Sequence, residues 1–164
     1  MMAYNTGQYD SRNKQSNFNS NYKQQKNNER NDYKIDATKM DLKPMELPDN
    51  YLQIAEDNMK EIAKEITTSK IRGFLSLVSK VYNVESVRTE ETLLPESIDT
   101  IQMMRIRIVY EAGRDNTGGV TKFLDKTRIL NYIKSIGDNR SKFIAFARYM
   151  EALVAYHRFY GGKE

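Results

Sequence analysis

The sequence has no cysteine, no tryptophan and a single histidine. Without cysteine, disulfides, thiolate metal sites and cysteine nucleophiles are excluded. A single histidine also excludes most histidine-based metal sites, so we expect no bound metal and no other cofactor. Zinc chemistry in particular is not expected.

Long apolar runs are also missing. None reaches the roughly 18 residues that a membrane-spanning helix requires, and the N-terminus opens with polar residues rather than an apolar signal stretch. We therefore expect a cytoplasmic protein without membrane contact. The length of 164 residues suits one domain plus a tail, and the mean hydropathy of -0.74 indicates a modest core.

The net charge of +4 is unevenly distributed along the chain. Residues 47–99 carry 6 Lys or Arg against 10 Asp or Glu, whereas residues 100–164 carry 12 against 6. A basic half of this kind suggests a polyanionic partner, although a moderate excess of cations is also common on solvated surfaces.

Residues 1–46 are rich in Asn and Gln and show neither the period of a strand nor that of a helix. We predict that they form a disordered, basic tail. The tail could touch a nucleic acid, or it could serve only to keep the protein in solution. Residues 47–164 form the predicted helical bundle domain.

Apolar residues beyond the tail recur with helical period, and no segment alternates as a strand does. The sequence therefore predicts an all-α fold, a single bundle of about five helices. These helices are expected at residues 50–66, 69–87, 95–112, 120–136 and 139–160. Asp49 or Asn50 can cap the first, Pro95 suits the first turn of the third, and Gly137 can end the fourth.

The helix predicted at residues 69–87 has one side of small and basic residues. This side gathers Arg72, Gly73, Ser76, Ser79 and Lys80. The small residues would let a phosphodiester backbone approach closely, with Arg72 and Lys80 pairing its charges. Lys70 adds a cation beside the free amides of the helix start. The same small residues would equally suit tight packing against a neighbouring helix.

The helix predicted at residues 95–112 places Arg107, Tyr110 and Arg114 along one line. Two guanidinium groups that flank an aromatic ring suit a nucleic-acid backbone and a splayed base. Arg105 projects near the apolar edge, where it could extend its charge to solvent or pair with an acid. A solvated basic face is the alternative interpretation.

The loop at residues 113–119 is rich in turn-forming residues, and its amides, together with Arg114, could cradle a phosphate. The loop lacks the Gly-Lys-Ser/Thr ending of a P-loop and does not follow a strand, so nucleotide hydrolysis is not expected. Lys122 and Arg128 extend positive charge along the following helix. Some of these cations could simply face solvent.

The helix predicted at residues 139–160 is apolar nearly all round, which is typical of a central helix or of one that meets a partner subunit. His157 lies within its apolar side. The sequence places no nucleophile or carboxylate beside this histidine, so we predict a hydrogen-bonded core residue. We therefore expect a non-enzymatic protein with no catalytic residue.

Three stretches of the chain share the pattern of one known family. They are ITTSKIRGFLSLVSKVYN, RIRIVYEAGRD and the C-terminal FARYMEALVAYHRFYGGK, of which the last is the most specific. From about residue 50 to its end, the chain resembles the small helical subunit of type III-A CRISPR effector complexes, the Csm complexes. The tail falls outside this resemblance.

The resemblance implies a non-catalytic bundle that serves antiviral defence. It would be present in several self-stacking copies, as an inner filament beside the guide-binding backbone subunits and the large subunit. Each copy would face the duplex of guide RNA and target RNA and contact mainly the target-strand backbone, because guide pairing supplies specificity. RNA cleavage and cyclic oligoadenylate synthesis would belong to other subunits.

The matching motif positions are Lys70 and Arg72 in the first stretch and Arg105, Arg107 and Arg114 in the second. Together with the cations of the neighbouring helices, they make up the predicted RNA-binding set. This set is Lys70, Arg72, Lys80, Arg105, Arg107, Arg114, Lys122 and Arg128.

Two other functions remain open on the sequence. The first is a helical adaptor that recruits a protein through the apolar side of residues 139–160, with the basic residues only maintaining solubility. The second is a helix-turn-helix DNA reader, which is disfavoured because no base-reading Asn or Gln is placed beside an Arg.

Overall fold

The computed structural model describes residues 40–162 and Glu164. Within this part of the chain there are six α-helices and no strand, apart from one isolated bridge between Thr92 and Asn139. The helices are α2 (Tyr51–Ile62), α3 (Thr68–Glu85), α4 (Pro95–Arg114), α5 (Gly119–Thr127), α6 (Ile129–Ile136) and α7 (Arg140–Phe159). The predicted all-α bundle is confirmed, and most of the predicted tail lies outside the described residues.

The helix predicted at residues 120–136 is two helices, because the chain turns at Arg128. This residue has φ 55° and ψ 22°, the left-handed conformation, and it separates α5 from α6. The Thr127 hydroxyl donates to the Phe123 carbonyl over 2.7 Å and is fully buried at the break. An arginine rarely adopts positive φ, so the sequence offered no reason to predict a turn at this position.

The first residues of α3 and α7 show why these helices begin where they do. Thr67 precedes α3, and its side chain accepts a hydrogen bond from the Lys70 amide over 3.4 Å. Asn139 precedes α7, and its side chain accepts one from the Lys142 amide over 2.9 Å. Each contact satisfies one of the amides that the first turn leaves without a helical partner.

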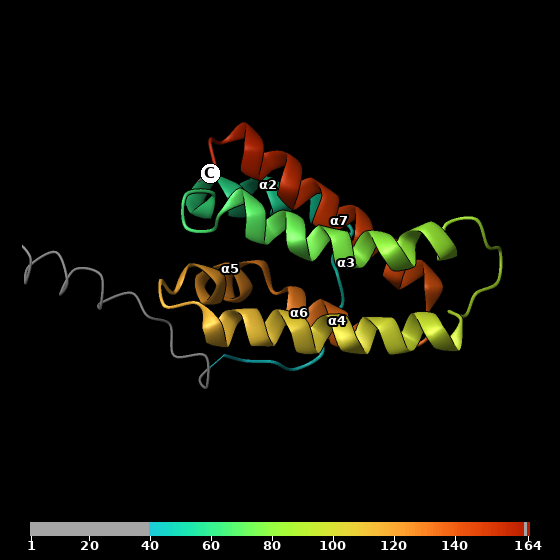
Figure 1. Ribbon diagram of the computed structural model, residues 1–164. Coiled ribbons are helices and arrows are strands. Elements are labelled where there is room, and N and C mark those ends of the chain that lie inside the picture. Colours follow the sequence, from blue (N-terminus) through green and yellow to red (C-terminus); the bar gives the residue numbers. More distant parts are fainter. Residues whose placement is uncertain (1–39, 163) are drawn as a thin grey trace, which may run out of the picture. The chain divides into compact units, whose positions relative to one another are not determined.

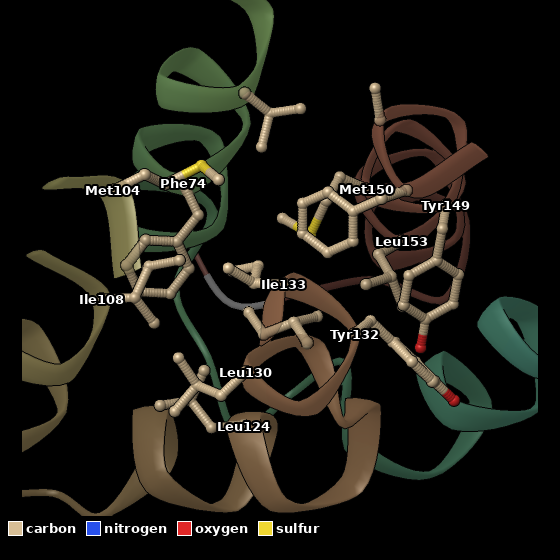
Figure 2. Packing of buried hydrophobic residues seen from close by; sticks show 14 of the residues in the cluster. Phe74, Met104, Ile108, Leu124, Leu130, Tyr132, Ile133, Tyr149, Met150 and Leu153 are labelled. Atoms are coloured by element: carbon tan, nitrogen blue, oxygen red, sulfur yellow. The ribbon is translucent and has the colours of Figure 1, made fainter. Parts of the chain in front are cut away.

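The core lies between α7 and the helices around it. Figure 1 shows α3 and α4 side by side and antiparallel, while α7 packs on α2 and α3. In Figure 2 the rings of Tyr132 and Tyr149 meet among Ile133, Met150 and Leu153. All five of these side chains are buried, so of the two alternatives that the sequence left open for the last helix, the structure shows the central one.

Tyr149 is the polar centre of this core. Its hydroxyl donates to the Thr127 carbonyl over 2.9 Å and accepts from the Asn58 amide over 3.2 Å. Burial raises the pKa of Tyr149 far above its ordinary value, so the ring stays neutral. Both hydrogen bonds join segments distant in sequence and fix α7 against α2 and the end of α5.

Glu85, at the end of α3, orients the link to α4. Its carboxylate is fully buried, and it accepts hydrogen bonds from the Leu94 amide over 3.0 Å and from Arg88 Nη1 over 2.7 Å. Burial acts to raise the pKa of this carboxyl, but hydrogen bonds from Ser97, the Leu94 amide and Arg88 outweigh it, so the pKa is lowered. The charged carboxylate thereby ties the C-terminus of α3 to the start of α4.

Residues 40–46 differ from the prediction, which assigned them to the tail. They form an extended segment against α6, where the Asn131 side chain donates to the carbonyls of Asp41 and Lys43 over 2.6 and 2.9 Å. The Met45 amide donates to the Asn131 carbonyl over 3.2 Å, and Lys134 donates to the Leu42 carbonyl over 2.6 Å. The side-chain contacts among these join a buried asparagine and a lysine to backbone carbonyls. They involve no apolar side chains at helical or strand spacing, so the hydrophobic pattern of the sequence could not predict them.

Candidate nucleic-acid interface

A groove of about 360 Å³ runs between α3 and α4. It is lined by Ser69, Lys70, Gly73, Phe74, Ser76, Leu77, Lys80, Arg107 and Glu111. Gly73 is exposed, and a Cβ added to it would meet nothing within 4 Å. Close helix packing is therefore not the role of this glycine, and the small residues of α3 instead leave the groove open.

A second groove, of about 540 Å³, continues from the first along α4. Its lining includes Leu77, Lys80, Arg107 and Glu111, all shared with the first groove, together with further residues of α4. The added residues are Thr100, Met103, Met104, Ile106, Tyr110 and Arg114. Because of the shared residues, the two grooves form one continuous surface, which we call the α3–α4 face.

The α3–α4 face carries more cations than anions. Lys80 and Arg107 are exposed and line both grooves, and neither forms an ion pair with any of the residues that the structure describes. Lys70 and Arg114 lie 3.9 and 4.0 Å from Glu111, at the outer limit of an ion pair. Lys70 also lies 3.9 Å from Asp115. Ion pairs at these separations are weak, so an incoming anion can compete for the cations.

Asp115 organises the loop after α4. One carboxylate oxygen accepts from the Val120 amide over 2.7 Å, and the other accepts from the Thr117 hydroxyl over 2.7 Å and amide over 3.2 Å. Burial raises the pKa of this carboxyl, but these hydrogen bonds outweigh it and the pKa is lowered. Within the loop, the Thr117 amide is occupied by this carboxylate, the Gly119 amide by the Thr117 hydroxyl and the Gly118 amide by the Asp115 carbonyl, so these three amides are not free for the expected phosphate.

Two residues predicted beside Lys80 on the small face of α3 lie outside both grooves. Arg72 is exposed, but it does not line either groove. The Ser79 hydroxyl donates to the Leu75 carbonyl of its own helix over 2.9 Å. At about 100° per residue, both positions point roughly a quarter-turn away from Lys80.

Arg105 is separated from Arg107 although the two are neighbours in sequence. It is half-buried, and on a helix a two-residue step places it on nearly the opposite side of α4. It lines neither groove. The RIR motif therefore contributes one guanidinium, that of Arg107, to the α3–α4 face.

Lys122 of α5 and Arg128, which follows α5, also lie apart from this face. Lys122 is 2.9 Å from Glu65, and Arg128 is 3.3 Å from Asp125. Of the eight predicted site residues, the structure thus brings together Lys70, Lys80, Arg107 and Arg114. Ile106 and Glu111 line the same surface and were not predicted. Ile106 could have been predicted to lie on an exposed surface, because it is an apolar residue outside the apolar stripe of its helix.

His157 is a core residue, as the sequence predicted. It is buried, and its Nε2 lies 2.9 Å from the Ile66 carbonyl oxygen. Among the described residues, no group of three or more His, Asp or Glu side chains is placed to hold a metal ion. In the same part of the chain, no helix has the length and apolarity to cross a membrane.

Comparison with known proteins identifies the family. Residues 45–163 match the family described as Csm2 Type III-A. The chain is 39% identical over 122 residues to "CRISPR system Cms protein Csm2" of Streptococcus thermophilus, covering 71% of this chain and 95% of that protein. The protein of the same name from Mycobacterium tuberculosis H37Rv is 31% identical over 122 residues, covering 72% of this chain and 97% of its own.

A third relative of that name, from Enterococcus italicus, is 33% identical over 98 residues, covering 58% of this chain and 68% of its own. The family match spans the whole bundle, including both helices of the α3–α4 face and the central α7. The resemblance read from the three sequence stretches is therefore confirmed. This chain belongs to the Csm2 family and is a small subunit of a type III-A CRISPR (Csm) effector complex.

Proposed function

We propose that the α3–α4 face binds the sugar–phosphate backbone of target RNA paired with guide RNA in the Csm complex. The observation that carries this proposal is the position of Lys80 and Arg107, two exposed cations from different helices that line one open groove. Gly73 and Ser76 keep the groove free of bulk between them. Cations around an open channel match the charge of a phosphodiester chain.

Binding of this kind does not read sequence. An A-form duplex hides its base edges in a deep, narrow groove and presents phosphates and 2′-hydroxyls. Lys80 and Arg107 can pair with phosphates, and the exposed Ser76 hydroxyl can hydrogen-bond the backbone. Specificity then comes from base pairing with the guide.

One subunit alone should bind weakly. The four cations of the α3–α4 face can neutralise at most roughly four phosphates, so the affinity should be on the order of micromolar or weaker and should fall steeply with salt. We propose that several copies stack as a filament beside the guide-binding backbone subunits and the large subunit. The linked copies would then gain affinity through avidity.

We further propose that the subunit is non-catalytic within the complex. His157, the single histidine of the sequence, is hydrogen-bonded in the core, and Asp115 accepts hydrogen bonds from its own loop and from the Val120 amide. The role that fits these observations is that of a scaffold which holds the target strand for other subunits.

The adaptor alternative depended on the apolar side of the last helix. In the structure Phe143, Phe146, Met150 and Leu153 of α7 are buried in the core. A partner protein could reach this side of α7 only if the bundle opened, which speaks against the adaptor.

The test compares assembled Csm complexes that contain either the natural subunit or the Lys80→Glu/Arg107→Glu variant. Binding is measured with several guide–target pairs of unrelated sequence. We expect complexes that assemble normally and bind every target more weakly by a similar factor, because each lost contact is to a phosphate. A loss confined to some sequences would support a base reader, and unchanged binding to all targets would overturn the proposal.

A further inference from the structure

The second groove contains three large side chains that are exposed although they are apolar or aromatic. Met103 is 63% exposed, Ile106 61% and Tyr110 60%. Their spacing of three and four residues places them together on one side of α4. Contiguous apolar surface of this kind marks an interaction site, so the patch needs an occupant.

The same groove is bordered by cations. Lys80, Arg107 and Arg114 all line it, and the Arg114 guanidinium carbon lies 5.9 Å from the centroid of the Tyr110 ring. Glu111 is the one carboxylate among the described residues of the lining. The groove volume of about 540 Å³ lies within the range of roughly 300 to 1,000 Å³ that small-molecule sites occupy.

We propose that this groove holds the base of an unpaired RNA nucleotide, stacked on Tyr110 and packed against Met103 and Ile106, with the adjoining phosphates at Lys80 and Arg107. The inference rests on the proposed function and adds to it a contact with the base itself. A nucleotide joins a flat π-face to an anion and so matches both the apolar and the cationic halves of the groove.

A protein neighbour matches the groove less well. It could cover Met103, Ile106 and Tyr110, but it would also have to remove three cations from water or supply carboxylates for them. A nucleotide brings the compensating charge in its own backbone. Because a paired base lies inside the duplex stack, the groove can receive a base only where the RNA strand is single or locally unpaired.

The test uses the full chain and two single-stranded RNAs of equal length and phosphate number, one with all bases and one abasic at alternate positions. Binding is measured at low salt by fluorescence anisotropy. We expect the natural protein to bind the complete RNA at least about fivefold more tightly than the abasic RNA. This factor corresponds to the lower end of the stacking free energy of one base on an aromatic ring. Tyr110→Leu should abolish this preference without weakening binding of the abasic RNA, and Tyr110→Phe should retain it.

Equal binding of both RNAs by the natural protein, unchanged in Tyr110→Leu, would overturn the inference. The proposed function would survive that result if Arg107→Gln still weakened binding of both RNAs. If the natural protein bound neither RNA, the inference would be overturned, and the proposed function would be decided by the assembled complexes alone. If Tyr110→Leu altered self-association in sedimentation and left both RNA affinities unchanged, the patch would belong to a protein neighbour and the inference would be overturned.

Discussion

The face formed by α2 and α5 and the face formed by α3 and α4 are both rich in cations, but they differ in where the matching carboxylates lie. On the first, Lys126 of α5 lies 2.6 Å from Glu61 of α2, and Lys122 of α5 lies 2.9 Å from Glu65 in the link that follows α2. These pairs hold two helices together and leave little net positive potential.

On the α3–α4 face, Lys80 and Arg107 have no such partners among the described residues, and Glu111 is at least 3.9 Å from the nearest cation. The comparison teaches that the density of Lys and Arg along a helix does not locate a polyanion site. What locates it is whether the fold supplies carboxylates opposite them, because a paired cation has little left to offer a phosphate.

The largest expected difference between the two faces is in how much the loss of one carboxylate lowers the free energy of unfolding. Glu85 is fully buried and joins α3 to α4, whereas Glu65 is exposed. Glu85→Ala should lower the free energy of unfolding by about 3 to 5 kcal/mol, because Arg88 and the Leu94 amide lose their buried partner. Urea unfolding followed by circular dichroism measures this effect.

Glu65→Ala is the matched control and should cost less than about 1 kcal/mol, because exposed pairs contribute little. Equal destabilisation by Glu85→Ala and Glu65→Ala would show that the two faces are held in the same way, which would remove the basis of the comparison.

Bulk placed in the groove should have the next largest effect. Gly73→Leu adds a side chain where nothing lies within 4 Å, so the protein should fold while a backbone in the groove is displaced. Loss of one charge-assisted contact corresponds to about a tenfold weaker RNA affinity. Gly113→Leu, also exposed and free of neighbours within 4 Å but not in the groove lining, should bind RNA normally. Normal binding by Gly73→Leu would place the RNA elsewhere.

Removal of the Asp115 carboxylate should have a moderate effect on stability, and this effect should depend on pH. Its pKa is lowered in the folded protein, so the stability it contributes is complete above its ordinary value of 3.8 and is lost as the pH falls through the folded value. Asp115→Ala should cost about 1 kcal/mol at neutral pH, as loss of a helix cap does. The difference from the natural protein should shrink in acid. Thermal unfolding at neutral and acid pH measures it, and a difference that grew in acid would contradict the assignment.

The sequence could predict the helices of these faces but neither the turn at Arg128 nor the ion pairs between helices. The helical period located α3, α4 and α7 because each buries a continuous stripe. The turn at Arg128 was missed because it depends on positive φ at a residue that seldom adopts it. The pairing of Lys122 with Glu65 was missed because the partners lie on different helices and meet only after folding.

The candidate site was partly predictable for the same reason. Arg107, Tyr110 and Arg114 share one helix, so their common side followed from spacing. Their meeting with Lys80 depends on the α3–α4 link, which no local pattern reports. Arg105 was included in the RNA-binding set because it belongs to the same motif as Arg107, although its predicted place was near the apolar edge, and in the structure it is half-buried and outside both grooves.

The smallest predicted effect concerns the stability of the paired face. Lys122→Gln/Lys126→Gln removes two exposed ion pairs, so it should lower the free energy of unfolding by about 1 kcal/mol or less in total. Lys80→Gln/Arg107→Gln should leave stability unchanged, because these cations hold no carboxylate in the described chain. Denaturant midpoints compare the two. A larger loss in the second variant would indicate that these cations stabilise the fold.

The most direct measurement is the salt dependence of RNA binding by those same two variants, which change the net charge equally. For the natural protein, a logarithmic plot of affinity against salt has a slope set by the number of phosphates contacted. Lys80→Gln/Arg107→Gln should reduce the slope by about two, and Lys122→Gln/Lys126→Gln should leave it near the natural value. Equal reductions in both variants would show that RNA responds to net charge alone, and would contradict the α3–α4 face as the site.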